Sequence, residues 1–283
     1  MKVLVTGSAG LLGRDVLRQL EGRRGMECIG ADKEDFDLLD ASAVRSYIES
    51  AAPDAIVHCA GYTQVDKAES QPEVCAAVNG LGTVHLLRAA GAVGAKVVYI
   101  SSAFVFPGTG EAPWQEDAAY GPVNVYGMSK VQGEDAVRSL TNHYFILRTG
   151  LLFGSHGPNF VRDLPELFRE KSEIRLPADQ FCSPSYTRDV ARVIGDMIVT
   201  EKYGIYHVRN EGFFSMAELA KTVMKKSGLR GRVLPVPSEE SPAPARRPLN
   251  ARLASVRLEA AGFRPMPDAE SALDRFLEEM KKN

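Results

Sequence analysis

The chain has 283 residues, of which 45% are hydrophobic and 25% charged, and its formal net charge is −2. This length allows a large buried core, as in one α/β domain that carries a smaller second domain. Nearly balanced charge without a basic block excludes the electrostatic footprint of nucleic-acid binding or of docking on an acidic membrane. We therefore expect no nucleic-acid partner and no membrane partner.

The first thirty residues have the pattern of a strand, a glycine turn and a helix. Lys2–Thr6 is apolar and β-branched, and residues 11–20 have apolar side chains at helical spacing. Between them Gly7, Gly10 and Gly13 are three residues apart, which suits a tight turn whose N–H groups face a pyrophosphate. An ordinary strand-to-helix turn is the alternative. At this place in the chain, the pattern favours a dinucleotide site.

A second predicted strand, Glu27–Ala31, ends at Asp32. An acid about 20 residues past a glycine loop can hold the adenosine ribose, which favours NAD. Lys33 and Arg14 are basic residues near the same place and could accept a 2′-phosphate. The expected cofactor is therefore NADP or NAD, with the choice between them open.

Further strands alternate with helices, which is typical of a doubly wound parallel sheet. Ala55–Ala60 and Lys96–Ile100 are predicted strands, and 43–51 and 73–91 are predicted helices. In such sheets ligands bind beyond the carboxyl ends of the strands. We therefore expect the functional residues in the segments that follow these strands.

The later part of the chain loses this alternation. Closely spaced prolines make 238–248 an extended loop, because proline cannot continue a helix. We predict an α/β fold with an NAD(P)-binding Rossmann domain over residues 1–150 and a return segment near 183–205. A smaller C-terminal substrate-binding domain would comprise 151–182 and 206–283.

Three residues are candidates for catalysis. Tyr126 and Lys130 are four apart on a predicted helix, so they share a face and the ammonium can favour the ionised phenol. Ser102 closely follows a strand end, where its hydroxyl could bond a substrate carbonyl oxygen. A solvated Tyr–Lys pair and a turn-forming serine are the alternatives. The order of all three favours proton donation to a carbonyl.

Cysteine usage and leader signals complete the composition. Cys28, Cys59, Cys75 and Cys182 form no C-x-x-C pair, so reduced thiols are expected and no metal site is predicted. The sequence shows no recognisable signal peptide and no apolar run long enough to span a bilayer. We expect a cytoplasmic protein.

With these motifs the chain resembles an extended short-chain dehydrogenase/reductase, and within that superfamily the dTDP-4-dehydrorhamnose reductase family. The glycine loop and the Tyr-x-x-x-Lys pair are shared by the superfamily. Tyr62–Glu69 and the Ala-Arg-Arg-Pro-x-Asn run of Ala245–Asn250 are more specific to the reductases. The similarity extends over nearly the whole chain.

The resemblance implies NAD(P)H-dependent reduction of a nucleotide-activated 4-keto-6-deoxy sugar, dTDP-4-dehydrorhamnose to dTDP-L-rhamnose. Tyr126 would give a proton to the carbonyl oxygen, Ser102 would bond it, and Lys130 would lower the pKa of Tyr126 and bond the nicotinamide ribose. Asn79 would hold the geometry of the active-site helix or a relay water. A homodimer is compatible with this family.

The resemblance also implies a set of binding residues. Those for the cofactor are Gly7, Gly10, Leu11, Leu12, Gly13, Asp32, Ala60, Gly61, Tyr62 and Lys130. Those for the substrate are Thr63, Phe104, Asn159, Gln180 and Arg246. Arg246 and its neighbour Arg247 could pair with the substrate diphosphate.

Two departures from the family pattern concern specificity. Ala103 and Phe104 stand where reductases usually have Asp and Tyr, and Leu151 replaces an aromatic residue. Because sugar dehydratases need an acid and a base after the catalytic Ser or Thr, Ala103 and Phe104 argue against dehydration. Two alternatives stay open: a sugar-nucleotide epimerase, and a non-catalytic regulatory subunit resembling the methionine adenosyltransferase β-subunit.

Overall fold

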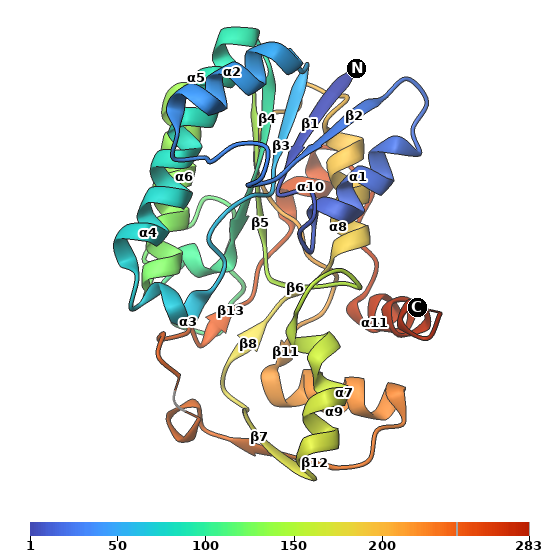
Figure 1. Ribbon diagram of the computed structural model, residues 1–283. Helices are drawn as coiled ribbons and strands as arrows, with labels where there is room; N and C mark the ends of the chain where they lie inside the picture. Colours follow the sequence, from blue (N-terminus) through green and yellow to red (C-terminus); the bar gives the residue numbers. More distant parts are fainter. Residues whose placement is uncertain (242, 283) are drawn as a thin grey trace.

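The computed structural model describes residues 1–241 and 243–282, and a six-stranded parallel sheet forms its centre (Figure 1). The strand order is β10-β5-β4-β3-β1-β2. The strands are β1 (Lys2–Thr6), β2 (Glu27–Ala31), β3 (Ala55–His58), β4 (Lys96–Ser102), β5 (Tyr144–Thr149) and β10 (Gly204–His207). Because β1 pairs with both β2 and β3, the winding reverses there, and such a switch point places ligands at the carboxyl ends.

Helices cover both faces of this sheet. Successive residues of a strand point to opposite faces of the sheet, so Val3 and Val5 of β1 pack into one core and Leu4 packs into the other. The first core includes α1 (Gly13–Glu21) and α8 (Thr187–Met197), and the second lies under α2 (Ala41–Ala51), α5 (Gly82–Val93) and α6 (Val125–Leu140). This arrangement confirms the predicted doubly wound α/β fold.

A smaller lobe lies beyond the carboxyl ends of the main strands (Figure 1). Its short strands are β6 (Leu151–Phe153), β7 (Glu173–Pro177), β8 (Phe181–Cys182), β9 (Pro184–Tyr186), β11 (Phe214–Ser215), β12 (Arg232–Val236) and β13 (Asn250–Ala251). Its helices are α7 (Phe160–Glu170), α9 (Met216–Ser227) and α11 (Ala269–Met280), and they enclose a separate apolar core. Ser215 and Glu218 form a capping box that fixes the start of α9.

The chain returns to the main sheet after entering the smaller lobe. It first returns through α8 and β10, and later through α10 (Val256–Ala260), which packs near β10. Leu258 and Phe263 belong to the core around α1 and α8. Part of 206–283 therefore packs with the larger lobe, a detail that the predicted domain division did not include.

The predicted helix over 73–91 contains an irregular turn. The structure has α4 (Pro72–Ala76), a π-helical turn η1 (Ala77–Leu81) and then α5. Asn79 lies in this turn and is buried. A π turn inserts one extra residue into the helical repeat and so changes which side chains face the neighbouring helix.

None of the described helices is both long enough and apolar enough to cross a bilayer. The four cysteines are free thiols, of which Cys75 and Cys182 are buried and Cys28 and Cys59 are half-buried. Within residues 1–241 and 243–282, no group of three or more His, Cys, Asp or Glu side chains is arranged to hold a metal ion.

Candidate functional site

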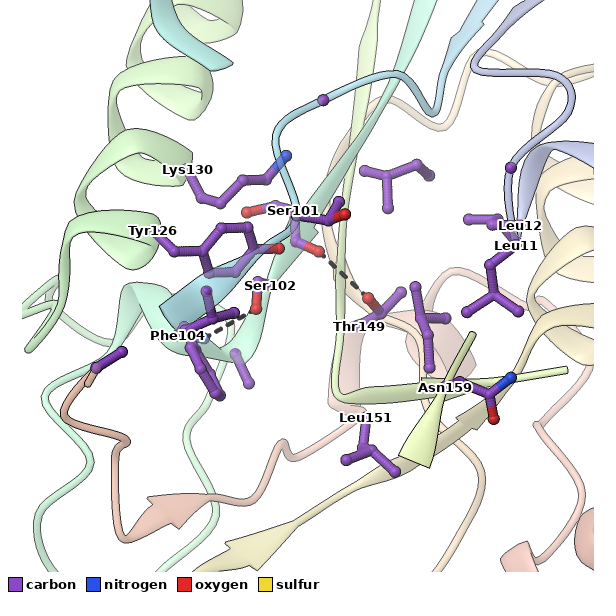
Figure 2. Close-up of a pocket in the computed structure, with 18 of the residues that line it drawn as sticks. Leu11, Leu12, Ser101, Ser102, Phe104, Tyr126, Lys130, Thr149, Leu151 and Asn159 are labelled. Atoms are coloured by element: carbon purple, nitrogen blue, oxygen red, sulfur yellow. Dashed lines mark hydrogen bonds between the residues drawn. The ribbon is translucent and has the colours of Figure 1, made fainter. Parts of the chain in front are cut away.

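A cleft of about 1550 Å³ lies between the two lobes, at the carboxyl ends of the main strands. Residues of both lobes line it, and Figure 2 shows the side chains around its centre. Nearly every predicted site residue lies on its wall. Those residues are Gly7, Gly10, Leu11, Leu12, Gly13, Asp32, Ala60, Gly61, Thr63, Ser102, Phe104, Tyr126, Lys130, Asn159, Gln180 and Arg246.

Two glycines of the turn, Gly7 and Gly13, are packed too closely for a side chain. Gly7 has a φ of +67°, and a Cβ there would lie 2.7 Å from the main-chain nitrogen of Ala60. A Cβ on Gly13 would lie 2.1 Å from the carbonyl oxygen of Gly7. No side chain caps α1 at Leu12, so the helix N-terminus presents free N–H groups. This cradle fits a pyrophosphate.

The carboxylate of Asp32 is hydrogen-bonded to the glycine turn. It accepts hydrogen bonds from the Ser8 hydroxyl and, at 3.0 Å, from the main-chain N–H of Ala9. Lys33 lines the same part of the cleft, whereas Arg14 is exposed and does not line it. Asp32 is therefore pre-oriented beside the region where a dinucleotide ribose would lie, and Lys33 is the basic residue on the same part of the cleft wall.

We expect Asp32→Ala to raise the Kd of NADH about tenfold or more, because a charged acceptor for the ribose hydroxyls is lost. The Kd of NADPH should change less, since removal of the carboxylate also removes repulsion toward a 2′-phosphate. Glu34→Ala has the same charge change at an exposed position outside the cleft lining and is the matched control. Fluorescence titration of both cofactors measures the effect, and equal losses for both would contradict it.

The three catalytic candidates meet at one end of the sheet. Ser102 ends β4, and Tyr126 and Lys130 lie in the first turns of α6, whose N-terminus is capped by Asn124. Figure 2 shows Tyr126, Ser102 and Lys130 extending into the same part of the cleft, opposite Leu11 and Leu12. Proton donor, hydroxyl and ammonium thus face the glycine turn across the cleft.

The ionisation of this pair differs from the expectation. Burial raises the pKa of Tyr126 to about 12, and a hydrogen bond with Ser102 opposes the rise. Burial lowers the pKa of Lys130 to about 8, which the carboxylate of Glu134 opposes. With its pKa raised, the phenol holds its proton at neutral pH. The expected lowering is wrong because burial removes the phenol from water and disfavours its ionised form.

Asn79 joins the π turn to the active-site helix. Its amide donates to the Tyr62 carbonyl at 3.0 Å and to the Ser129 hydroxyl at 2.8 Å, and its oxygen accepts from the Tyr62 N–H at 2.8 Å. Ser129 in turn donates to the main-chain oxygen of Tyr126 at 2.7 Å. Asn79 therefore sets the position of α6 relative to the strand-end segment around Gly61.

Among the residues predicted to bind cofactor or substrate, Tyr62 does not line the cleft. Its main chain is held by Asn79, and its phenol donates to the side chain of Gln71 at 3.1 Å. That Tyr62 contacts the cofactor stays a prediction, for which its main chain and not its phenol is the closer part to the cleft residues Gly61 and Thr63. Its neighbours Gly61 and Thr63 lie on the cleft wall because alternate residues of the extended segment point to opposite sides.

A buried charged network supports the site from behind. The Glu134 carboxylate accepts from Arg148 at 2.7 Å, from the Tyr120 phenol at 2.7 Å and from Ser101. Arg148 and Glu134 are both almost completely buried. The network joins β4, β5 and α6 beside Ser102. Sequence reasoning gave neither residue a role, although both lie in segments that resemble the family.

The substrate side of the cleft has one apolar wall. Phe104 meets the ring of Tyr126 edge-on at a centroid distance of 6.0 Å, and Leu151 also lines the cleft. Asn159 is already engaged, because its side chain caps α7 and donates to Gly154 and Gly157 carbonyls. Its role as a free substrate ligand is therefore not supported by the geometry.

Arg247 is paired with a carboxylate of the protein itself. Its guanidinium makes two hydrogen bonds to Asp66, at 2.8 and 2.7 Å, and Asp66 also accepts from the N–H of Ala245. These contacts fasten the proline-rich loop across the cleft to α3 (Val65–Ala68). Both arginines line the cleft, but Arg246 is exposed whereas the guanidinium of Arg247 is already paired with Asp66, so Arg246 is the better candidate for a diphosphate.

Loosening this loop should weaken substrate binding. Asp66→Asn removes one charge of a half-exposed ion pair that contributes about 0.5–1 kcal/mol. We expect the KM of the sugar nucleotide to rise about two- to fivefold with kcat nearly unchanged, as measured by steady-state kinetics. An unchanged KM would show that the loop keeps its place without the charge pair.

Comparisons with known proteins identify the family of the chain. The family model described as "RmlD substrate binding domain" matches residues 1–282. A dTDP-4-dehydrorhamnose reductase of Streptomyces griseus is 38% identical over 95% of this chain and 91% of the relative. A solved dTDP-4-dehydrorhamnose reductase from Clostridium acetobutylicum gives a TM-score of 0.96 at 33% identity, covering 99% and 100% of the two chains. The Bacillus anthracis reductase in complex with NADP gives 0.94 at 38% identity, covering 98% and 99%. The chain therefore belongs to the dTDP-4-dehydrorhamnose reductase family of extended short-chain dehydrogenases/reductases.

Proposed function

We propose that the protein reduces the 4-keto group of a nucleotide-activated 6-deoxy sugar with NADPH or NADH, converting dTDP-4-dehydrorhamnose to dTDP-L-rhamnose. The observation that carries the proposal is the meeting of Ser102, Tyr126 and Lys130 opposite a glycine cradle. The names of relatives that match over nearly the whole chain support the substrate, and the NADP complex of one of them supports the cofactor.

The cofactor, when bound, supplies a hydride to the carbonyl carbon. The glycine turn and the N-terminus of α1 would hold its pyrophosphate, Asp32 its adenosine ribose and Lys130 its nicotinamide ribose. Each of these groups comes from a different strand end or helix start of the larger lobe. The lobe would thus fix the cofactor, while the smaller lobe contacts the sugar nucleotide.

Tyr126 supplies the proton that the reduction consumes. Because burial raises its pKa to about 12, the phenol is protonated at neutral pH and can donate from Oη to the carbonyl oxygen. Ser102 donates a hydrogen bond to the same oxygen as negative charge develops there. A raised pKa is therefore compatible with a donor in the reductive direction.

The apolar wall beside Tyr126 suits a deoxygenated sugar. In a 4-keto-6-deoxy sugar the carbon next to the carbonyl carbon bears a methyl group, so a carbonyl held by Tyr126 has an apolar substituent nearby. The Phe104 ring contacts the Tyr126 ring and would bury that methyl group. Ala103 and Phe104 supply no acid or base, which argues against dehydration in this cleft.

Oxidation of NADPH and of NADH by purified protein, with dTDP-4-dehydro-6-deoxy-L-mannose made in place from its precursor, tests the proposal. We expect loss of reduced cofactor that depends on the sugar nucleotide, together with formation of dTDP-L-rhamnose. Binding of cofactor without oxidation would contradict the proposal. In that case, epimerisation of sugar nucleotides and binding to a methionine adenosyltransferase catalytic subunit are the alternatives to test.

A further inference from the structure

Lys130 has few polar neighbours for a charged side chain. It is only 7% exposed, and no described residue accepts a hydrogen bond from its Nζ within good geometry. Instead Nζ lies 4.3 Å from the centroid of the Tyr99 ring. Tyr99 is 1% exposed and lies on β4, three residues before Ser102. An aromatic ring therefore lies against one side of the ammonium.

The other titratable groups around Lys130 supply little compensating charge. Burial lowers the pKa of His58 on β3 to about 3 and raises that of Cys59 to about 12, so both are neutral at pH 7. Burial also raises the pKa of the Cys75 thiol of α4. Tyr126 on α6 is protonated, as shown above. On the same helix, Glu134 is the one anion among these groups.

Glu134 is already occupied by other donors. Its carboxylate is bonded to Arg148, Tyr120 and Ser101, which satisfies its charge within the buried network. An ammonium placed over an aromatic face is attracted by the negative face of the ring. Lys130 lines the open cleft, so its Nζ faces the cleft on one side, and the Tyr99 ring supplies the attraction on the protein side.

We propose that Tyr99 is a positioning residue whose ring face holds the Lys130 ammonium at the cofactor side of the cleft and keeps it charged. The Tyr99 phenol makes no well-formed hydrogen bond to the described residues, with Thr83 as a polar neighbour. The ring, and not the hydroxyl, is therefore what position 99 contributes. The inference rests on the proposed function, in which Lys130 binds the nicotinamide ribose of the cofactor that reduces the sugar carbonyl.

NMR of the protein labelled with 13C at the lysine ε-carbon tests the inference without turnover, with Lys130→Arg to assign the resonance. The Hε protons of Lys130 should be shifted upfield by the ring current in the wild type and in Tyr99→Phe. In Tyr99→Leu this shift should be lost, and the titration midpoint should fall by about one pH unit or more. Tyr99→Met is the second variant if Tyr99→Leu folds poorly, as judged by thermal unfolding.

Kinetics give a second readout. If protonated Lys130 is required, kcat/KM falls as the pH rises through the pKa of Lys130, which gives the pH profile of kcat/KM an alkaline limb. A lower pKa of Lys130 moves this limb to lower pH. The limb should move by about one pH unit in Tyr99→Leu, and Tyr99→Phe should restore the wild-type limb. A merely structural role would reduce the amount of folded enzyme and leave the limb in place.

Two results would overturn the inference. One is a folded Tyr99→Leu or Tyr99→Met protein whose Lys130 chemical shift and titration midpoint match the wild type. The other is a Tyr99→Phe protein that behaves like Tyr99→Leu, which would assign the effect to the hydroxyl. Because the NMR observables need neither cofactor nor substrate, a failure of the proposed reduction would leave them unchanged and is thus distinguishable.

Discussion

Replacement of Tyr126 by Phe is expected to lower kcat by about 100-fold or more, the scale of general acid catalysis. The variant loses one hydroxyl that hydrogen bonds with Ser102 and keeps the ring that packs against Phe104. Cofactor affinity should therefore remain nearly the same. Steady-state turnover and a cofactor fluorescence titration, performed on the same preparation, measure the two effects separately.

The matched control is Tyr203→Phe. Tyr203 packs against Phe145 and His143 and does not line the cleft. The same chemical change there should leave turnover near the wild-type value. If Tyr126→Phe also retains turnover, the phenol is not the proton donor and the assignment of the catalytic group fails.

Replacement of Arg148 by Met should lower the free energy of unfolding by about 3–5 kcal/mol, because it leaves the buried carboxylate of Glu134 without its cation. Both side chains are almost completely buried, and a guanidinium nitrogen of Arg148 lies 2.7 Å from a carboxylate oxygen of Glu134. Desolvation makes the unpaired charge costly even though the intact pair contributes little net stability. Urea denaturation followed by circular dichroism measures the loss.

The double variant Glu134→Leu with Arg148→Met separates the two contributions. It removes both charges, so a substantial part of the stability lost in Arg148→Met should return, less the cost of leaving Ser101 and Tyr120 without their acceptor. If Arg148→Met lowers the free energy of unfolding by less than about 1 kcal/mol, water reaches Glu134 and the network is not excluded from solvent.

The sequence was most informative where function depends on local geometry. The glycine spacing predicted the turn at Gly7 and Gly13, since a close main-chain approach excludes every other residue there. The four-residue spacing placed Tyr126 and Lys130 on one face of α6. Ser102 was placed beside them because ligands bind at the carboxyl ends of parallel strands. Each of these inferences needs only residues that are near in sequence or that follow a recognisable strand.

It was least informative where a side chain has a distant partner. Asp66 and Arg247 are 181 residues apart, and nothing in either segment alone shows that the arginine is engaged. The π turn around Asn79 is similarly invisible, because its sequence has ordinary helical character and the extra residue is fixed by contacts with Tyr62 and Ser129. The pKa of Tyr126 depended on desolvation, which requires the fold.

The repeated passage of the chain between the two lobes limits how the molecule can come apart. The backbone enters the smaller lobe after β5, returns at α8, leaves again after β10 and comes back through α10 before α11. Cutting one crossing therefore leaves the halves joined by the others, so neither lobe can separate as an independent piece. A protease nick in one connecting segment should therefore leave a particle of unchanged size in solution, because the remaining crossings and the packing of α10 near β10 still hold the two lobes together.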